Sequence, residues 1–176
     1  ETELLAGWAV EACTSLSDPV VVDLCTGSGA VAKAVAQEVP HAQVHAVELD
    51  ESAHAWAERN LLGTGIDLRL GDMATAFVCN PPYIPLDAWE SVASEARDHD
   101  PHLALFSGDD GLDAMHVLER RAAQLLRPGG VVGAEHADLQ GESAPGVFVA
   151  SGRWSDVRDH ADLAGRARFL TARLAR

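Results

Sequence analysis

Basic residues are scarce in this 176-residue chain, and so are aromatic ones, at 5%. Only 13 Lys and Arg stand against 27 Asp and Glu, which gives a formal net charge of −14, and Lys33 is the only lysine. A surface this negative repels phosphate backbones unless its basic residues are clustered. Six arginines fall in the last 24 residues, but acidic residues such as Asp159 and Asp162 are interspersed with them, which favours a solvated mixed face. We therefore do not expect a nucleic acid as the direct substrate.

The three cysteines, Cys13, Cys25 and Cys79, are an odd number without metal-ligand spacing. This pattern predicts reduced thiols rather than a disulfide framework. No apolar run approaches the ~20 residues that span a bilayer, and no signal-peptide pattern opens the chain. The eight histidines show no convergent set of ligands, so no metal site is predicted. We expect a soluble, cytoplasmic and monomeric protein.

The composition that remains, 47% hydrophobic and 23% charged, is typical of a globular protein, and the length fits one α/β domain over residues 1–176. Helical periodicity alternates with β-branched runs, which indicates a parallel sheet with right-handed crossovers. Helices are predicted from Leu4 to Cys13, Ala30 to Val39, Ser52 to Leu62, Leu112 to Leu126 and Glu142 to Ala150. Strands are predicted at Val20–Cys25, Gln43–Glu48, Asp67–Leu70, Phe77–Cys79, Val131–Glu135, Asp156–His160 and Arg168–Arg173. Trp8 and Trp56 fall on helical stripes and are expected in the core.

One connection in this plan is too short. Only six residues separate Leu70 from Phe77, whereas a crossover between parallel strands usually needs about ten to twelve residues, counting its helix. We therefore expect that a segment of chain is absent near Ala74 to Ala76.

A glycine turn follows the first predicted strand. In the segment Asp23 to Gly29, two glycines stand where a parallel strand gives way to a helix. Glycines there let a ligand approach the backbone, while the helix N-terminus offers free N–H groups. The turn alone is weak support for a ligand site, because a tight strand-to-helix turn also needs glycine for steric reasons.

Glu48 strengthens the interpretation, because it stands at the end of the second strand, where a carboxylate can accept both hydroxyl protons of a ribose. The turn suits NAD, with Ala32 as a third small residue, or S-adenosylmethionine, whose methionine and ribose would lie over the same turn. Asp23 before the glycines and Asp72 after the third strand favour the second ligand.

A second motif, Asn80-Pro81-Pro82-Tyr83, follows another predicted strand. Its two prolines fix φ and remove two donors, so the loop accepts hydrogen bonds and donates few. The Asn80 side-chain oxygen and the Pro81 carbonyl could hold both protons of an –NH₂ group, while the Tyr83 ring stacks on a flat amide or base. Methylation of a planar nitrogen needs such positioning, because its delocalised lone pair is a weak nucleophile.

Together these residues resemble the HemK (PrmC) family of protein-glutamine methyltransferases, which modify the Gln of the Gly-Gly-Gln motif in peptide chain release factors. The resemblance covers nearly the whole chain. It rests on Glu1 to Leu5, Asp23 to Gly29, Asn80 to Tyr83, Asp100 to Phe106 with Gly108, Asp110, Gly111 and Leu112, and Arg127 to Gly130 followed by Glu135. The Asn-Pro-Pro-Tyr motif alone is shared with adenine methyltransferases, whereas the Asp100 to Phe106 segment is characteristic of the glutamine enzymes.

The resemblance implies a class I S-adenosylmethionine-dependent methyltransferase fold: Rossmann-like α/β, with a mostly parallel seven-stranded sheet and helices on both faces. It implies S-adenosylmethionine as the cofactor and release factors as protein partners. Cofactor contacts are implied at Cys25, Thr26, Gly27, Ser28, Gly29, Glu48, Asp72, Met73 and Asn80. The target amide would be held by Asn80, Pro81, Pro82 and Tyr83, of which Asn80, Pro81 and Tyr83 are the expected catalytic residues.

The chain departs from the family pattern at two of these positions. Cys25 stands where the family usually has Gly, and Met73 stands where some members have an aromatic residue. The chain begins at Glu1 without the helical N-terminal domain that members use to grip the release factor, so we expect a catalytic domain alone. The excess of alanine and arginine over lysine indicates a GC-rich, bacterial genome.

Three alternative functions stay open on the sequence. An adenine-N6-type nucleic-acid methyltransferase would share the Asn-Pro-Pro-Tyr motif, and an NAD-dependent oxidoreductase would use the same glycine turn. A binding module that keeps the cofactor fold without catalysis is the third.

Overall fold

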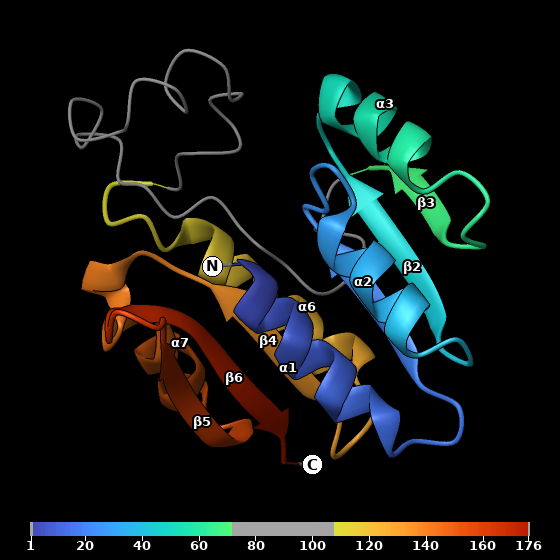
Figure 1. The fold of residues 1–176 in the computed structure, drawn as a ribbon. Helices are drawn as coiled ribbons and strands as arrows, with labels where there is room; N and C mark the ends of the chain where they lie inside the picture. The colour runs from blue at the N-terminus through green and yellow to red at the C-terminus, as the bar shows by residue number, and fades with distance from the viewer. Residues whose placement is uncertain (1, 72–107, 176) are drawn as a thin grey trace. The chain divides into compact units, whose positions relative to one another are not determined.

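A computed structural model describes residues 2–71 and 108–175 (Figure 1). The chain divides into two compact units, which are treated separately below. The first consists of Glu1–Asn80 with Val132–Glu135, and the second of Pro81–Val131 with His136–Arg176.

The first unit contains three parallel strands in the order β1-β2-β3, namely β1 (Val20–Leu24), β2 (Gln43–Glu48) and β3 (Asp67–Leu70). Their register aligns Val20 with Gln43 and Glu48 with Leu70. The helices of this unit are α1 (Thr2–Thr14), α2 (Ala30–Glu38) and α3 (Glu51–Asn60). Strand, turn and helix thus alternate as predicted, and the carboxyl ends of β1 and β2 come together.

Small and β-branched side chains fill the core of the first unit. Its buried members are Ala9, Cys13, Val21, Ala32, Val35, Val39, Val44, Ala46, Ala57 and Leu61. Part of β4 (Val131–Glu135) also belongs to this unit, and there Gly133 lies against α1. A Cβ at Gly133 would come within 2.5 Å of Trp8 Cζ3 and 2.9 Å of Leu5 Cδ1, so only glycine permits this approach.

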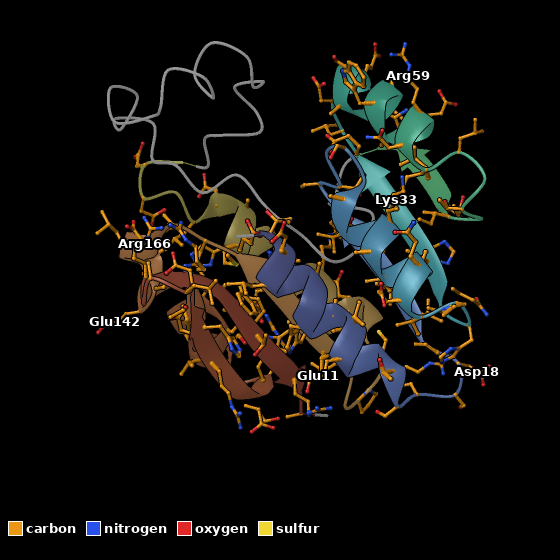
Figure 2. The ribbon with its side chains drawn as sticks, in the orientation of Figure 1. Glu11, Asp18, Lys33, Arg59, Glu142 and Arg166 are labelled. Atoms are coloured by element: carbon orange, nitrogen blue, oxygen red, sulfur yellow. The ribbon has the colours of Figure 1, made fainter. Side chains whose placement is uncertain are left out.

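The prediction that both tryptophans lie in the core is confirmed for Trp8 and wrong for Trp56. Trp8 packs against the core as predicted, but Trp56 is 58% exposed. Arg59, which Figure 2 labels on α3, stands over the Trp56 ring, with its guanidinium carbon 5.1 Å from the ring centroid. The helix α3 buries only Ala57, because the small and charged residues around Trp56 leave the helix without a wide apolar face.

In the second unit, β5 (Trp154–Ala161) pairs antiparallel with β6 (Ala167–Leu174). Two further backbone hydrogen bonds reach β6 within this unit: the Gly129 N–H donates to the Leu174 C=O, and the His136 N–H donates to the Arg168 C=O. The helices are α6 (Asp113–Leu125), α7 (Ser143–Ser151) and a short 3-10 turn, η3 (Asp138–Gln140), which the sequence did not predict.

A buried carboxylate ties α6 to the start of β5. Glu119 receives two hydrogen bonds from Arg153, at 3.0 and 2.6 Å, and one from Trp154 Nε1 at 2.7 Å. Burial alone would raise the pKa of Glu119, but these hydrogen bonds outweigh it and hold the pKa below its ordinary value. Because three donors meet one carboxylate, this contact fixes both elements.

The arginines near the end of the chain pair with acidic neighbours, as the mixed sequence predicted. Arg166 and Arg168 contact Asp162, and Arg158 and Arg173 contact Asp156. In the part of the chain that the structure describes, no helix has the length and apolar character to cross a membrane. The predicted strand Phe77–Cys79 and the short connection before it lie outside the described residues.

Candidate functional site

The glycine turn joins β1 to α2 within the first unit. Three of its residues lie in the left-handed region: Cys25 with φ 52°, Gly27 with φ 55° and Gly29 with φ 85°. The Gly29 N–H donates to the Thr26 carbonyl at 2.8 Å, which closes the turn. Cys25 holds a conformation that costs a non-glycine residue roughly 1 to 2 kcal/mol, so the departure from glycine noted in the sequence falls on a strained position.

Asp23 lies beneath this turn and is 3% exposed. Its Oδ2 accepts hydrogen bonds from Thr26 Oγ1 at 2.6 Å and from the Ala32 N–H at 3.0 Å. Burial raises the pKa of Asp23 to about 6; the two hydrogen bonds oppose the rise, and the Glu48 charge adds to it. The carboxylate therefore joins the turn to the first turn of α2.

Glu48 stands at the carboxyl end of β2, as predicted, and is 8% exposed. Its Oε2 accepts the Gly27 N–H at 2.8 Å, and its Oε1 accepts the N–H groups of Leu49 and Asp50, each at 2.9 Å. A carboxylate offers about four acceptor positions, so three are already used by backbone donors. The side chain thus holds the turn itself, a role that sequence reasoning missed because backbone N–H groups carry no residue identity.

The space around the two glycines differs. A Cβ at Gly27 would meet no atom within 4 Å, so the turn is open on that side. A Cβ at Gly29 would come within 2.9 Å of the Leu61 side chain, so that side is closed by the end of α3. An open glycine backbone beside a carboxylate at a strand end fits a nucleoside ligand with a ribose.

Two further residues at the end of α3 reach the turn and were not singled out in the sequence. Asn60 Nδ2 donates to the Ser28 carbonyl at 3.0 Å, and Leu61 packs on Gly29. No sequence pattern singles out Asn60 and Leu61 as neighbours of the turn. Their distance from it depends on the direction in which α3 runs after β2.

The structure brings together the predicted site residues from Cys25 to Gly29 and Glu48. The others lie outside the described residues: Asp72, Met73, Asn80, Pro81, Pro82, Tyr83 and the segment Asp100 to Phe106. Among residues 2–71 and 108–175, no group of three His, Cys, Asp or Glu side chains could hold a metal ion.

Solved structures share this fold at low sequence identity. The catalytic domain of hMettl16 in complex with the MAT2A 3′UTR hairpin 6 matches 97% of this chain and 68% of its own length, with a TM-score of 0.70 and 15% identity. A methyltransferase from Pyrococcus furiosus matches 98% of this chain and 83% of its own length, with a TM-score of 0.63 and 19% identity. The fold is that of the class I S-adenosylmethionine-dependent methyltransferases. Six of the seven expected strands lie in described residues.

Sequence relatives indicate which methyltransferases this chain is similar to. The chain is 57% identical to the release factor glutamine methyltransferase of Streptomyces coelicolor and 41% identical to that of Mycolicibacterium smegmatis, over 99% and 100% of its length. Over nearly its whole length the chain is thus similar to release factor glutamine methyltransferases. A 4-amino-L-phenylalanine/4-methylamino-L-phenylalanine methyltransferase of Streptomyces pristinaespiralis is 46% identical over 78% of the chain and half of its own length. No family model matches the chain.

The chain spans 66% of the length of both release factor methyltransferases, just under two thirds. The alignment with the Streptomyces coelicolor protein runs over 187 positions although the chain has 176 residues, so at least 11 of those positions have no residue in this chain.

Proposed function

We propose that the protein transfers a methyl group from S-adenosylmethionine to the side-chain amide nitrogen of the Gln in the Gly-Gly-Gln motif of peptide chain release factors. The observation that carries this proposal is the 57% identity, over 99% of the chain, to a release factor glutamine methyltransferase. The open glycine turn held by Glu48 supports the cofactor part of the proposal. We propose further that it works as a cytoplasmic monomer.

The residues of the turn fit the proposed cofactor. Glu48 has one acceptor position left for a ribose hydroxyl, and the backbone from Cys25 to Gly29 is open at Gly27. Asp72, Met73 and Asn80 complete the proposed contacts. When bound, the cofactor supplies an electrophilic methyl group on a sulfonium, so the protein's task is to bind, orient and exclude water.

The substrate amide is assigned to Asn80, Pro81, Pro82 and Tyr83. The Asn80 side-chain oxygen and the Pro81 carbonyl would accept the two amide protons and stabilise the positive charge that develops on nitrogen during transfer. The Tyr83 ring would lie on the flat amide. As the methyl group bonds to nitrogen, its bond to the sulfonium sulfur would break, and the amide would then release one proton to solvent and become neutral again.

A methylation assay tests the substrate class. The chain and a bacterial release factor are incubated with S-adenosylmethionine, and the Gly-Gly-Gln peptide is analysed by mass spectrometry. We expect one added methyl group on the Gln and none when Asn80→Ala replaces the parent chain. A parallel reaction contains free 4-amino-L-phenylalanine, because one relative is named for that substrate. Methylation of the amino acid but not of the release factor would overturn the proposed substrate.

Calorimetric titration of Gly27→Ala tests the cofactor site separately. The new Cβ meets no protein atom, and the positive φ costs alanine only roughly 1 to 2 kcal/mol, but the methyl group would occupy the open side of the turn. We expect affinity for S-adenosylmethionine and S-adenosylhomocysteine to fall at least about tenfold, which corresponds to ~1.4 kcal/mol. Gly165→Ala is the control, because Gly165 also has positive φ and open space around it. Unchanged affinity in Gly27→Ala, or binding of NAD instead, would contradict the site.

A further inference from the structure

Three consecutive residues of the glycine turn are each held by a residue from the segment that runs from β2 through α3. Gly27 N–H donates to Glu48, the Ser28 carbonyl accepts from Asn60 Nδ2 at 3.0 Å, and Gly29 lies against Leu61. Glu48 belongs to the predicted cofactor site, but the last two contacts come from the far end of α3 and are not part of it.

These contacts fix two peptide planes. The Thr26–Gly27 peptide is bonded at both ends, because its carbonyl accepts from Gly29 and its N–H donates to Glu48. The Ser28–Gly29 peptide is also bonded at both ends: its N–H donates to Thr26, and its carbonyl accepts from Asn60. A flip of the second plane would break both bonds.

Such a flip is otherwise easy for this sequence. Glycine adopts positive and negative φ about equally, so Gly29 at φ 85° does not by itself select one orientation of the Ser28–Gly29 plane. The hydrogen bond from Asn60 favours the observed one. A ligand that binds only this orientation loses apparent affinity in proportion to the fraction of molecules that leave it.

The helix that carries Asn60 is itself anchored at both ends. At its start, the Asp50 side chain accepts from the Ala53 N–H at 2.8 Å, and the Asp50 N–H donates to Glu48. At its end, the Thr64 hydroxyl donates to the Leu61 carbonyl at 2.6 Å. The side chain that reaches the turn therefore starts from a fixed backbone.

We propose that Asn60 is a positioning residue for cofactor binding, which holds the Ser28–Gly29 peptide in the orientation that the cofactor requires. This inference rests on the proposed function. Asn60 acts through the turn, supported by the packing of Leu61 on Gly29.

The variant Asn60→Asp tests the proposal, because it keeps the shape of the side chain and replaces the donor with a carboxylate. Arg59→Gln is the matched control: it makes the same change in net charge one residue away, on a side chain that stacks on Trp56. Asn60→Gln keeps an amide donor on a longer side chain. Its hydrogen exchange and its affinity for S-adenosylhomocysteine should therefore lie between those of the parent and those of Asn60→Asp.

Two measurements are made on each variant. Hydrogen exchange of the peptide from Leu24 to Val31, without ligand, should be faster in Asn60→Asp than in the parent and in Arg59→Gln. Titration with S-adenosylhomocysteine should show affinity about three- to tenfold weaker, as expected for one lost hydrogen bond. The KM for S-adenosylmethionine should rise by a similar factor while kcat at saturation stays the same.

If Asn60→Asp shows the same hydrogen exchange and the same affinity as Arg59→Gln, the proposal is overturned. A fall in kcat of Asn60→Asp without a change in KM would also overturn it. If the parent chain binds neither S-adenosylmethionine nor S-adenosylhomocysteine, the proposed function fails and the cofactor role of Asn60 fails with it. The exchange measurement still decides in that case whether Asn60 orders the turn, so the two failures are distinguishable.

Discussion

The carboxyl group of Asp23 is buried beneath the glycine turn, where its environment favours the protonated form. Its pKa is raised to about 6, whereas an unfolded chain would protonate it near its ordinary value of 3.8. The stability that this group contributes is therefore fully present below about pH 4 and is lost as the pH rises through about 6.

Asp23→Asn should remove this pH dependence, because an amide oxygen can accept the same hydrogen bonds from Thr26 and Ala32 without carrying a charge. Relative to the parent, the free energy of unfolding of the variant should increase by about 2 to 3 kcal/mol between pH 4 and pH 8. Urea denaturation at several pH values measures the difference. Parallel stability profiles for the two proteins would contradict the assignment.

At this scale the sequence predicted which residues meet but not how they bond. The pattern of Cys25 to Gly29 with Glu48 was sufficient to bring the turn and the carboxylate together, because parallel strands end at one edge. The sequence did not reveal that Glu48 uses three backbone donors, nor that Asn60 holds Ser28. Those contacts are hydrogen bonds to backbone groups. Nearly every residue carries such groups, so the sequence does not show which of them face Glu48 or Asn60.

At the scale of elements, β2, β3 and β4 begin and end at the predicted residues. Strands β2 and β4 each contain two valines, and β3 is followed directly by Gly71, which marks its end. The 3-10 turn η3 was missed because three residues are too few for a periodic pattern. Trp56 was misjudged because helical spacing gives a stripe but does not say whether a neighbouring element covers it. No neighbour in the described residues buries Trp56.

The close contact between α1 and β4 leads to a prediction at Gly133. In Gly133→Ala the new methyl group would overlap Trp8, 2.5 Å away, and should lower the free energy of unfolding by about 1 to 3 kcal/mol. Gly7→Ala, within α1, has open space around its Cβ and should raise it by roughly 0.5 to 1 kcal/mol. Chemical denaturation compares the two variants. Equal stability of Gly133→Ala and the parent would show that α1 and β4 are not packed as described.

At the scale of the whole molecule, the net charge of −14 bears on nucleic-acid binding, because one protein that shares this fold was solved in complex with an RNA hairpin. The arginines near its end pair with Asp156 and Asp162, so they form no uncompensated basic strip among the described residues. Phosphate backbones should therefore be repelled even where the fold is shared.

A direct test uses an RNA hairpin and a DNA duplex at about 50 mM salt, where electrostatic attraction is strong. We expect no binding of either at micromolar protein concentration, measured by fluorescence anisotropy. The positive control is the same assay with the catalytic domain of hMettl16 and its RNA hairpin, a pair that was solved as a complex. Micromolar binding of the nucleic acids, weakening steeply with salt, would instead favour the adenine-N6-type alternative.

The pairing of β6 with β5 affects how the second unit folds during synthesis. A ribosome synthesises β5 before the strand that pairs with it. Until residues 167–174 emerge, the nascent chain lacks the buried side chains of Phe169, Leu170, Ala172 and Leu174. A premature stop before residue 167 would thus remove the strand that pairs with β5, and would leave β5 as an exposed strand edge for chaperones and proteases to recognise.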